Sequence, residues 1–455
     1  MDLYGSLVRR VLYPAWESGV RRRPTLARLR RLQALERASA DELEAFQRGE
    51  LAALLRHAAA HVPYYRRLFA EAGARPEDIR GRQDLARLPI LTRQAARDSA
   101  DQRMSTAEPL PIIKKTTGGT TGEPLVIRYD PDSEYWRQAV RLRGFGWTGW
   151  RIGDPSLHYW GEYTKERSLA VVAKERVDRA LKREHYIDCT PRGDQHKEEV
   201  VAAIRRIRPR AIFCYAQAGA ELARHINRTG ARTWDTIPVV CGAERVFPAD
   251  RAALEQAFGR SVFETYGCRE TMLIATECGE HEGLHIQMEN LLVEVVDDSG
   301  APVRPGEVGE VVLTDLHNYG QPFIRYANGD LAVLMPEDDR CRCGRVHPRL
   351  ASVEGRQTET LRDREGKPVG GMIFNLAFSP LAEVVRQFQA VQHRDGSITV
   401  KVVPAGAGGE LPRAALDHVA RSCARYLPGV PVLFEAVADI PATRTGKRRV
   451  VVVET

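Results

Sequence analysis

Apolar and amphipathic segments alternate in the middle of the chain, and this alternation limits the fold more than any other feature. The apolar runs are IFCY (212–215), IPVVC (237–241) and SVFETYG (261–267). Helical patterns lie between them, one through Glu221-Leu222-Ala223 and one near 248–258. Strand, helix, strand, helix and strand in this order predict a parallel sheet with crossover helices, an α/β fold.

Parallel sheets of this kind bind ligands beyond the carboxyl ends of their strands. Two short segments occupy that position here, and topology alone makes them site candidates. They are Gly242-Ala243-Glu244 and Tyr266-Gly267-Cys268-Arg269-Glu270.

The regions before and after this central alternation have different patterns of apolar residues. Ser39 and Glu42 have the spacing of a capping box, and apolar residues follow at helical intervals, so the amino-terminal region is mainly helical. After residue 286, alternating runs at 291–297 and 310–316 predict antiparallel strands in a barrel-like or distorted sheet.

The last hundred residues predict a small α+β domain. Its expected elements are a helix near 380–390, a strand at 397–403, a helix at 413–426 and a strand at 432–440. A chain of 455 residues exceeds the size at which one core keeps growing. We therefore expect a large domain of residues 1–355 and a small domain of residues 356–455.

A glycine- and threonine-rich segment lies between the strand-like runs PIIKK and PLVIRY. Its glycines let backbone N–H groups turn toward one point, and its hydroxyls add donors, which predicts a nest for polyphosphate. It is not a Walker loop, because no Gly-Lys-Ser/Thr follows; a flexible hairpin is the alternative. The segment is Thr116, Thr117, Gly118, Gly119, Thr120, Thr121, Gly122, Glu123 and Pro124.

This segment resembles the phosphate loop of the adenylate-forming superfamily of acyl-CoA synthetases, peptide-synthetase adenylation domains and luciferases. Four further segments resemble that family's motifs in the family's order: YGCRE (266–270), YANGD (326–330), GRQTE (355–359) and RTGKRR (444–449). Within the superfamily, HVPYYRRLF (61–69), GAERVFP (242–248) and FIRYANGDL (323–331) look most like the phenylacetate-CoA ligase branch. The resemblance covers roughly residues 40 to 455.

The resemblance implies an ATP- and Mg²⁺-dependent ligase with a large amino-terminal domain and a small mobile lid. Such an enzyme activates a carboxylic acid, here expected to be aromatic, as its acyl-AMP and passes the acyl group to coenzyme A. Two alternatives stay open. In the first, the acceptor is not coenzyme A but a carrier-protein thiol, an amine or a hydroxyl. In the second, the chain is a noncatalytic nucleotide-binding or membrane-docked scaffold. For the oligomeric state, a homodimer is one possibility.

The resemblance further implies roles for individual residues. Glu270 would hold Mg²⁺, since a hard cation prefers carboxylate oxygen. Asp330 would accept hydrogen bonds from both ribose hydroxyls, and Lys447 would neutralise charge on the acid and the α-phosphate. The remaining nucleotide contacts would come from Gly242, Ala243, Glu244, Tyr266, Gly267 and Arg356, with Tyr266 against adenine and Arg356 on ribose or phosphate.

Each of these residues has a plainer structural alternative. Glu270 would form only a salt bridge, Tyr266 would be a buried aromatic side chain at a strand end, and Asp330 would only form a turn. The hinge segment also departs from the family pattern of Gly-Arg-x-Asp-Asp, because Thr358 and Glu359 occupy the last two places. This departure concerns the second half-reaction, which the resemblance couples to a rotation at the hinge.

Four of the metal-binding side chains of the sequence fall into two short segments. Cys278 and His281 with Cys341 and Cys343 offer three thiolates and an imidazole, a set that suits structural Zn²⁺. His285 is a rival fourth ligand, and unliganded cysteines are the alternative.

Residues 1–35 form a basic arm. Its arginines are interleaved with apolar residues (Tyr4, Leu7, Val11, Leu12 and Trp16), while the rest of the chain is close to neutral although the net charge is +7. This distribution does not indicate a nucleic-acid-binding domain, whose basic residues line one broad face. The arm is expected to pack as a helix on the enzyme's own body, with docking on an anionic membrane or on a partner as the alternative.

No run of about 18 uncharged apolar residues marks a membrane span, and the start Met1-Asp2-Leu3-Tyr4 lacks the layout of a signal peptide. These features predict a cytoplasmic enzyme.

Overall fold

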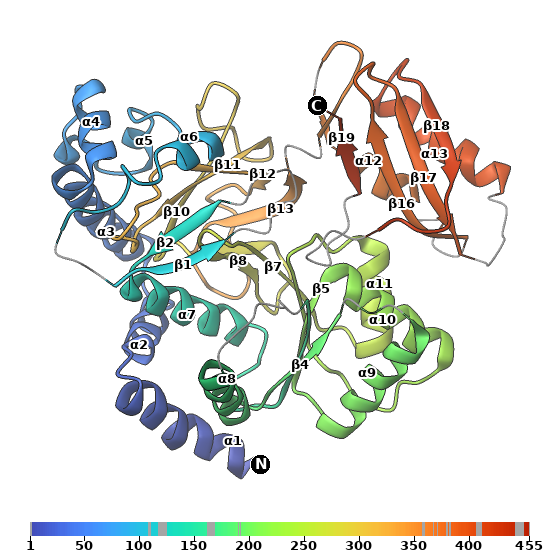
Figure 1. The fold of residues 1–455 in the computed structure, drawn as a ribbon, viewed down its shortest axis with the longest axis horizontal. Helices are drawn as coiled ribbons and strands as arrows, with labels where there is room; N and C mark the ends of the chain where they lie inside the picture. The colour runs from blue at the N-terminus through green and yellow to red at the C-terminus, as the bar shows by residue number, and fades with distance from the viewer. Residues whose placement is uncertain are drawn as a thin grey trace.

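The described residues fold into an eleven-stranded mixed sheet, a four-stranded sheet and two small hairpins, with helices packed beside the two larger sheets (Figure 1). This α/β organisation confirms the predicted fold class. The computed structural model describes residues 2–107, 111–116, 125–161, 169–189, 191, 193–356, 360–366, 368–370, 372–378, 381, 384–405, 412–441 and 450–454.

One half of the large sheet is parallel. Its neighbouring strands, in spatial order, are β4 (Glu184–Asp188), β3 (Ser156–Trp160), β5 (Ala211–Tyr215), β6 (Val239–Gly242) and β7 (Val262–Cys268). The three apolar runs of the sequence thus form adjacent parallel strands. β7 ends this half, because its other neighbour runs antiparallel to it.

The other half is antiparallel and continues the same sheet. Its spatial order is β8 (Met272–Glu277), β9 (Leu284–Ile286), β13 (Arg349–Arg356), β12 (Tyr326–Leu334), β11 (Val308–Asp315) and β10 (Leu291–Val296). The predicted distorted antiparallel sheet therefore extends the parallel strands, and the described strands close no barrel.

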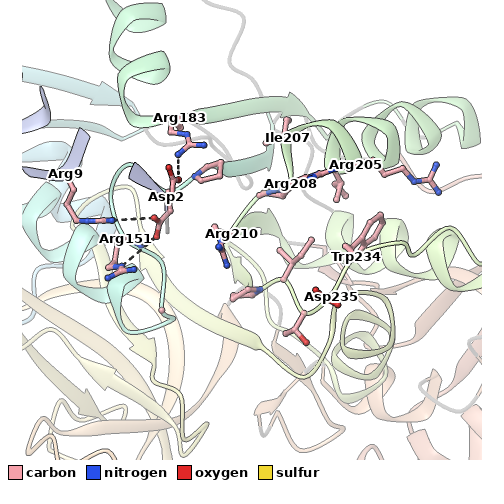
Figure 2. Close-up of a pocket in the computed structure, with 18 of the residues that line it drawn as sticks. Asp2, Arg9, Arg151, Arg183, Arg205, Ile207, Arg208, Arg210, Trp234 and Asp235 are labelled. Atoms are coloured by element: carbon pink, nitrogen blue, oxygen red, sulfur yellow. Dashed lines mark hydrogen bonds and ion pairs between the residues drawn. The ribbon is translucent and has the colours of Figure 1, made fainter. Parts of the chain in front are cut away.

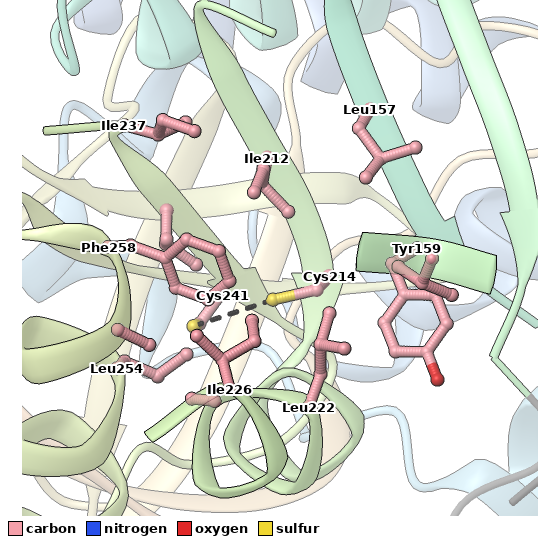
Figure 3. Close-up of a cluster of buried hydrophobic side chains, with 14 of the residues drawn as sticks. Leu157, Tyr159, Ile212, Cys214, Leu222, Ile226, Ile237, Cys241, Leu254 and Phe258 are labelled. Atoms are coloured by element: carbon pink, nitrogen blue, oxygen red, sulfur yellow. Dashed lines mark hydrogen bonds between the residues drawn. The ribbon is translucent and has the colours of Figure 1, made fainter. Parts of the chain in front are cut away.

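Helices cover both faces of the parallel strands. Ile212 and Cys214 of β5 face a core formed with α9 (Asp194–Ile207), α10 (Ala216–Thr229) and α11 (Pro248–Phe258), shown in Figure 3. Ala211 and Phe213, which alternate with them, pack on the opposite face with Leu142 of α7 (Pro131–Gly146). Because both faces are buried, the central strands β5 and β6 are apolar without interruption. α8 (Leu169–Lys182) precedes β4.

The amino-terminal region is helical, as predicted. It comprises α1 (Leu3–Leu7), two π-helical segments η1 (Val8–Leu12) and η2 (Ala15–Val20), α2 (Thr25–Leu35), α3 (Ala40–His61), α4 (Pro63–Glu71), η3 (Pro76–Asp78), α5 (Arg82–Leu85) and α6 (Arg93–Asp98). The capping box of α3 forms: the Ser39 N–H donates to Glu42 Oε2 at 2.8 Å, and Ser39 Oγ accepts from the Glu42 N–H at 3.3 Å. β1 (Ile113–Thr116) and β2 (Val126–Tyr129) then pair as antiparallel strands.

Residues beyond 360 build their own apolar core on the four-stranded sheet. The elements are β14 (Thr360–Arg362), β15 (Pro368–Gly370), α12 (Met372–Phe378), β16 (Val385–Gln392), β17 (Ile398–Pro404), α13 (Arg413–Tyr426), β18 (Val432–Ala436) and β19 (Val451–Val453). In Figure 1 this unit lies at the opposite side of the molecule from α1.

The helix predicted near 380–390 is wrong. The segment is β16, which pairs with β17 on one side and with β19 on the other. Ala390 is buried against that sheet, and β-branched Val385 and Val391 favour an extended backbone there. The helix of this region is α12, which lies earlier in the chain.

No helix among the described residues is long and apolar enough to cross a membrane.

Candidate active site

Tyr266 and Gly267 lie in β7, where the sheet changes from parallel to antiparallel. The register between β7 and β8 shifts between these two residues, which is the signature of a bulge. A Cβ atom on Gly267 would overlap the carbonyl oxygen of Met272, so only glycine fits at this position. The glycine of this motif is thus explained by local packing, before any ligand is considered.

Two motifs that are distant in sequence meet at Tyr266. Its hydroxyl donates to Asp330 Oδ2 at 2.9 Å, and Asn328 Nδ2 donates to both of these oxygens at 2.8 Å. All three side chains are buried. Burial raises the pKa of Tyr266 well above its usual value, and the charge of Asp330 raises it further. The phenol therefore stays a donor, and Asp330 is held in one orientation.

Arg356 lies beside this cluster. The register between β12 and β13 places Asp330 directly opposite Arg356. Two of the predicted ribose-contacting residues therefore lie on neighbouring strands, as a shared ligand would require.

Glu270 follows β7 and is almost completely buried, with 3% of its surface exposed. Its Oε1 atom accepts hydrogen bonds from the Tyr326 hydroxyl and from Arg93 Nη1, both at 3.1 Å. Burial raises the pKa of Tyr326, and the Glu270 charge adds to the effect. A hard cation that keeps most of its water and phosphate ligands needs only one or two carboxylate oxygens from the protein, so this side chain fits Mg²⁺.

The loop after β6 brings a second pair of predicted residues to the same end of the sheet. Ala243 has a φ of 66°, which turns the backbone sharply after Gly242. A Cβ atom on Gly242 would lie 2.9 Å from Thr265 Oγ1 and 3.3 Å from the Trp160 ring, so this position is also crowded. Glu244 Oε2 accepts from the Gln217 N–H at 3.1 Å, at the start of α10.

Trp160 and Tyr215 end β3 and β5, and their ring centroids lie 4.2 Å apart. They stand next to Gly242 at the carboxyl ends of the parallel strands. The aromatic pair and the loop after β6 thus border one region.

Several predicted residues lie outside the described part of the chain. They are Thr117, Gly118, Gly119, Thr120, Thr121 and Gly122 of the phosphate loop, Thr358 and Glu359 of the hinge, and Lys447. Thr116 ends β1 opposite Val126 of β2, so the loop connects two paired strands, as its flanking sequences predict.

Two residues of this site were not predicted. Asn328 stands inside the YANGD motif, where its amide orients Asp330 through the backbone and the side chain. Arg93 begins α6 and belongs to no motif. Its only sequence signal is the Thr92 cap of that helix, which does not indicate a partner 177 positions away.

A second cluster gathers four potential metal ligands. The ligand atoms of Cys278, His285, Cys341 and Cys343 all lie within 4.8 Å of one another. Cys278 Sγ lies 3.6 Å from Cys341 Sγ, and Cys343 Sγ lies 3.4 Å from His285 Nε2. Tetrahedral zinc with bonds of about 2.3 Å separates its sulfur ligands by about 3.8 Å. Burial lowers the pKa of His285 to about 3, which keeps the imidazole neutral as a ligand must be.

His281 lies outside this cluster, and the rival candidate His285 lies inside it. His281 Nδ1 lies 3.4 Å from Glu277 Oε2, and its ring lies 4.8 Å from that of Phe263. The reason is the hairpin of β8 and β9. Thr276 pairs with His285 and Glu277 with Leu284, so Cys278, two residues beyond Thr276, lies diagonally across from His285, while His281 sits in the turn.

Comparison with known proteins connects this geometry to a family. A family model described as AMP-binding enzyme matches residues 184–317. The phenylacetate-coenzyme A ligase of Thermus thermophilus is 30% identical over 373 residues, which cover 80% of this chain and 81% of that protein. The enzyme of the same name from Escherichia coli is 30% identical over 347 residues, covering 73% of this chain and 75% of that protein.

A solved structure shows the same fold. The 2-hydroxyisobutyryl-CoA ligase in the postadenylation state, in complex with 2-HIB-AMP, aligns with a TM-score of 0.72 at 21% identity, over 92% of this chain and 91% of its own. With the motifs joined at one end of the sheet and relatives 30% identical over most of its length, the chain belongs to the phenylacetate-coenzyme A ligase family of AMP-binding enzymes.

Proposed function

We propose that the chain activates a carboxylic acid with ATP as its acyl-AMP and transfers the acyl group to coenzyme A. Family membership supports this AMP-forming ligase activity, and so confirms the function predicted from the motifs. The observation that carries the assignment of the site is the hydrogen-bonded cluster of Tyr266, Asn328 and Asp330. It joins two motifs 64 positions apart at the carboxyl end of the sheet.

In the first half-reaction, a carboxylate oxygen of the acid attacks the α-phosphorus of ATP and pyrophosphate leaves. Such a reaction depends on positioning and on neutralising charge. Asp330 would hold the ribose hydroxyls, oriented by Tyr266 and Asn328. Glu270 would hold Mg²⁺, and Lys447 with the phosphate loop of residues 116–122 would neutralise the phosphate charge.

In the second half-reaction, the thiol sulfur of coenzyme A attacks the acyl carbon, the thiol proton is lost, and AMP leaves. Coenzyme A is the acceptor used across the family, and we extend it to this chain. A carrier-protein thiol, an amine or a hydroxyl is the competing acceptor class, and the experiment below separates them.

We further propose an aromatic acid as substrate. The relatives act on phenylacetate by name, and Trp160 with Tyr215 offers two aromatic faces beside Gly242. The faces of such side chains offer large apolar surfaces on which a further aromatic ring can pack. Gly242, Ala243 and Glu244 would contact the adenine base on the other side of that loop.

The test is acid-dependent ATP–pyrophosphate exchange over matched aryl and alkyl acids, followed by thioester detection with coenzyme A. We expect exchange with aryl acids and an acyl-CoA product. Exchange without acyl-CoA would move the acceptor to another class. No exchange with any acid would favour the noncatalytic scaffold.

We propose structural zinc for Cys278, His285, Cys341 and Cys343. Three thiolates and one imidazole complete a tetrahedral set and leave no position for substrate, so the metal would stabilise structure rather than react. It would link the β8–β9 hairpin to the loop that precedes β13.

The zinc proposal has a matched pair of variants. Purified protein should contain about one zinc per chain by elemental analysis, His285→Ala should lose most of it, and His281→Ala should retain it. Far less than one zinc per unmodified chain, or equal loss in both variants, would remove the proposal.

A further inference from the structure

The helical segment at the start of the chain packs its inner side on the enzyme. Val8 and Tyr13 are buried, and Val8 lies against Gly153. Trp16 Nε1 donates to Asp178 of α8 at 3.1 Å. This confirms that the basic arm packs on the enzyme's own body.

The outer side of the same segment is apolar as well. Leu3 is 76% exposed, Leu7 46% and Val11 52%, at intervals of four residues along α1 and η1. Tyr4 lies next to this row and is half exposed. A surface helix usually carries polar residues on its outer side. A row of exposed apolar residues on one helix marks an interaction surface.

An arginine-lined cavity of about 1300 Å³ adjoins this segment (Figure 2). Its walls include Asp2, Ser6, Arg9 and Arg10 from the arm, so the helix and the cavity form one surface. Seven arginines line it against three aspartates (Arg9, Arg10, Arg151, Arg183, Arg205, Arg208 and Arg210 against Asp2, Asp154 and Asp235).

Only some of these arginines are paired. Arg9 and Arg151 lie 3.4 and 3.9 Å from Asp154, and Arg183 pairs with Asp2. Among the described residues, Arg10 and Arg208 form no salt bridge with a carboxylate, and Arg210 is close enough to lower the pKa of Asp2 without forming a salt bridge with it. In Figure 2, Arg208 and Arg210 lie between the two groups of lining residues. The surface therefore has positive charge that its own carboxylates do not neutralise.

The cavity lies at the amino ends of the parallel strands. Pro155, Arg210 and Pro238 line it, and they directly precede β3, β5 and β6. Trp160, Tyr215 and Gly242 end the same three strands. The arginine-lined surface and the candidate active site therefore occupy opposite ends of one set of strands.

We propose that this surface docks the enzyme on an anionic lipid membrane. The apolar row of α1 and η1 enters the region between headgroups and acyl chains, and the unpaired arginines contact lipid phosphates. Apolar burial together with attraction to anionic lipid is the combination that holds interfacial helices. The candidate active site faces away from the membrane in this orientation.

The test is cosedimentation of the full-length protein with phosphatidylcholine vesicles that contain or lack about 30 mol% phosphatidylglycerol, at low and high salt. We expect binding that requires the anionic lipid and weakens at least about tenfold at high salt, because surface charge is screened. An apolar variant (Leu3→Ser, Leu7→Ser, Val11→Ser) and a charge variant (Arg10→Ala, Arg208→Gly, Arg210→Ala) should each bind at least about tenfold more weakly. Glycine suits position 208, where φ is 49°.

Matched controls change exposed residues elsewhere. Leu433→Ser removes an exposed leucine of β18, and Arg37→Ala, Arg80→Ala, Arg87→Ala removes three exposed arginines. Both controls should bind vesicles like the unmodified protein, and all variants should keep their ATP–pyrophosphate exchange. The two test variants alter the surface independently, so a folding defect in one leaves the other decisive.

Three results would overturn the proposal. The first is no binding of the unmodified protein to anionic vesicles at low salt. The second is binding of inorganic phosphate without vesicle binding, which would make the cavity a site for a soluble anion. The third is a dimer that the apolar variant converts to monomer without any vesicle binding, which would make the helix an interface between two copies.

Discussion

The two ends of the parallel strands handle charge in opposite ways. At the carboxyl end, Glu270 and Asp330 are buried and each is held by defined donors. At the amino end, Arg10, Arg208 and Arg210 line an open cavity and form no salt bridge among the described residues, although Arg210 lowers the pKa of Asp2.

This difference in burial and pairing of charge indicates which kind of ligand each end of the strands can bind. A buried, oriented carboxylate recognises a ligand with matching donors at fixed positions, because each misplaced atom leaves a charge unpaired. Exposed positive charge without a fixed geometry attracts any dense anionic surface. The predictions below test the carboxyl end first and then a buried histidine in the middle of β3, from the largest expected effect to the smallest.

Removing Lys447 should have the largest effect. Lys447→Ala deletes the charge that the family resemblance assigns to the carboxylate and α-phosphate, and we expect ATP–pyrophosphate exchange to fall about 10²–10³-fold, as for the loss of one electrostatic contact in a transition state. Arg449→Ala is the control, since it removes a neighbouring charge of the same basic motif, RTGKRR (444–449). Equal loss in both variants would indicate that the loop contributes only general positive charge.

Asp330→Asn should have the second largest effect. It keeps the size of the side chain but removes the charge that accepts from Tyr266 and Asn328 and that would accept from ribose. Hydrogen bonds to charged groups contribute about 1.5–3 kcal/mol, so kcat/KM for ATP should fall about 10- to 100-fold. Asp298→Asn, at an exposed position, should leave it unchanged. An unaltered kcat/KM in Asp330→Asn would remove the ribose assignment.

Arg93→Gln tests whether the carboxyl end depends on charge pairing for its stability. Glu270 would lose its arginine while staying buried, and we expect the free energy of unfolding to fall by about 1–3 kcal/mol, less than for a fully buried pair because the Arg93 side chain is 27% exposed. Arg67→Gln breaks the exposed pair with Glu71 and should change the free energy of unfolding by less than about 0.5 kcal/mol. Urea unfolding of the three proteins measures both effects.

His158→Gln extends the comparison to a buried histidine in the middle of β3, between the two ends. Burial lowers the pKa of His158 to about 3, and Arg141, Arg179, His185 and Lys182 lower it further. Its usual pKa of 6.5 returns on unfolding, so the unfolded state binds the proton more strongly below that pH.

Stability from this histidine is therefore complete above pH 6.5 and is lost as the pH falls toward about 3. Between about pH 7.5 and 5.5 the unmodified protein should lose about 1 kcal/mol more than His158→Gln does. His61→Gln, at an exposed position, should keep the full pH dependence. An identical pH dependence in His158→Gln would mean that His158 is already protonated in the folded state.

Much of the fold could be predicted because it depends on local patterns. The apolar runs of β5, β6 and β7 and the capping box of α3 each specify their own element. The segment 385–392 was misassigned because its extended form depends on pairing with β17 and β19, which no local pattern reveals.

The site followed the same rule. Tyr266, Glu270 and Asp330 lie in short motifs, which the sequence reveals by their resemblance to the family's motifs and by their order along the chain. His285 and Arg93 reach their partners through a hairpin register and a long-range contact, respectively. The proposed roles of Lys447 and of the phosphate loop stay predictions, as does the domain boundary at residue 355.

The position of β13 has a mechanical consequence. This strand begins a few residues after Cys343 and ends at Arg356, inside the hinge segment of residues 355–359. A metal that ties Cys341 and Cys343 to the β8–β9 hairpin would anchor the near end of the strand. The first residues of β13 would then be fixed in place. Any rotation of the residues that follow β13 would occur about its last residue, Arg356, which lies opposite Asp330.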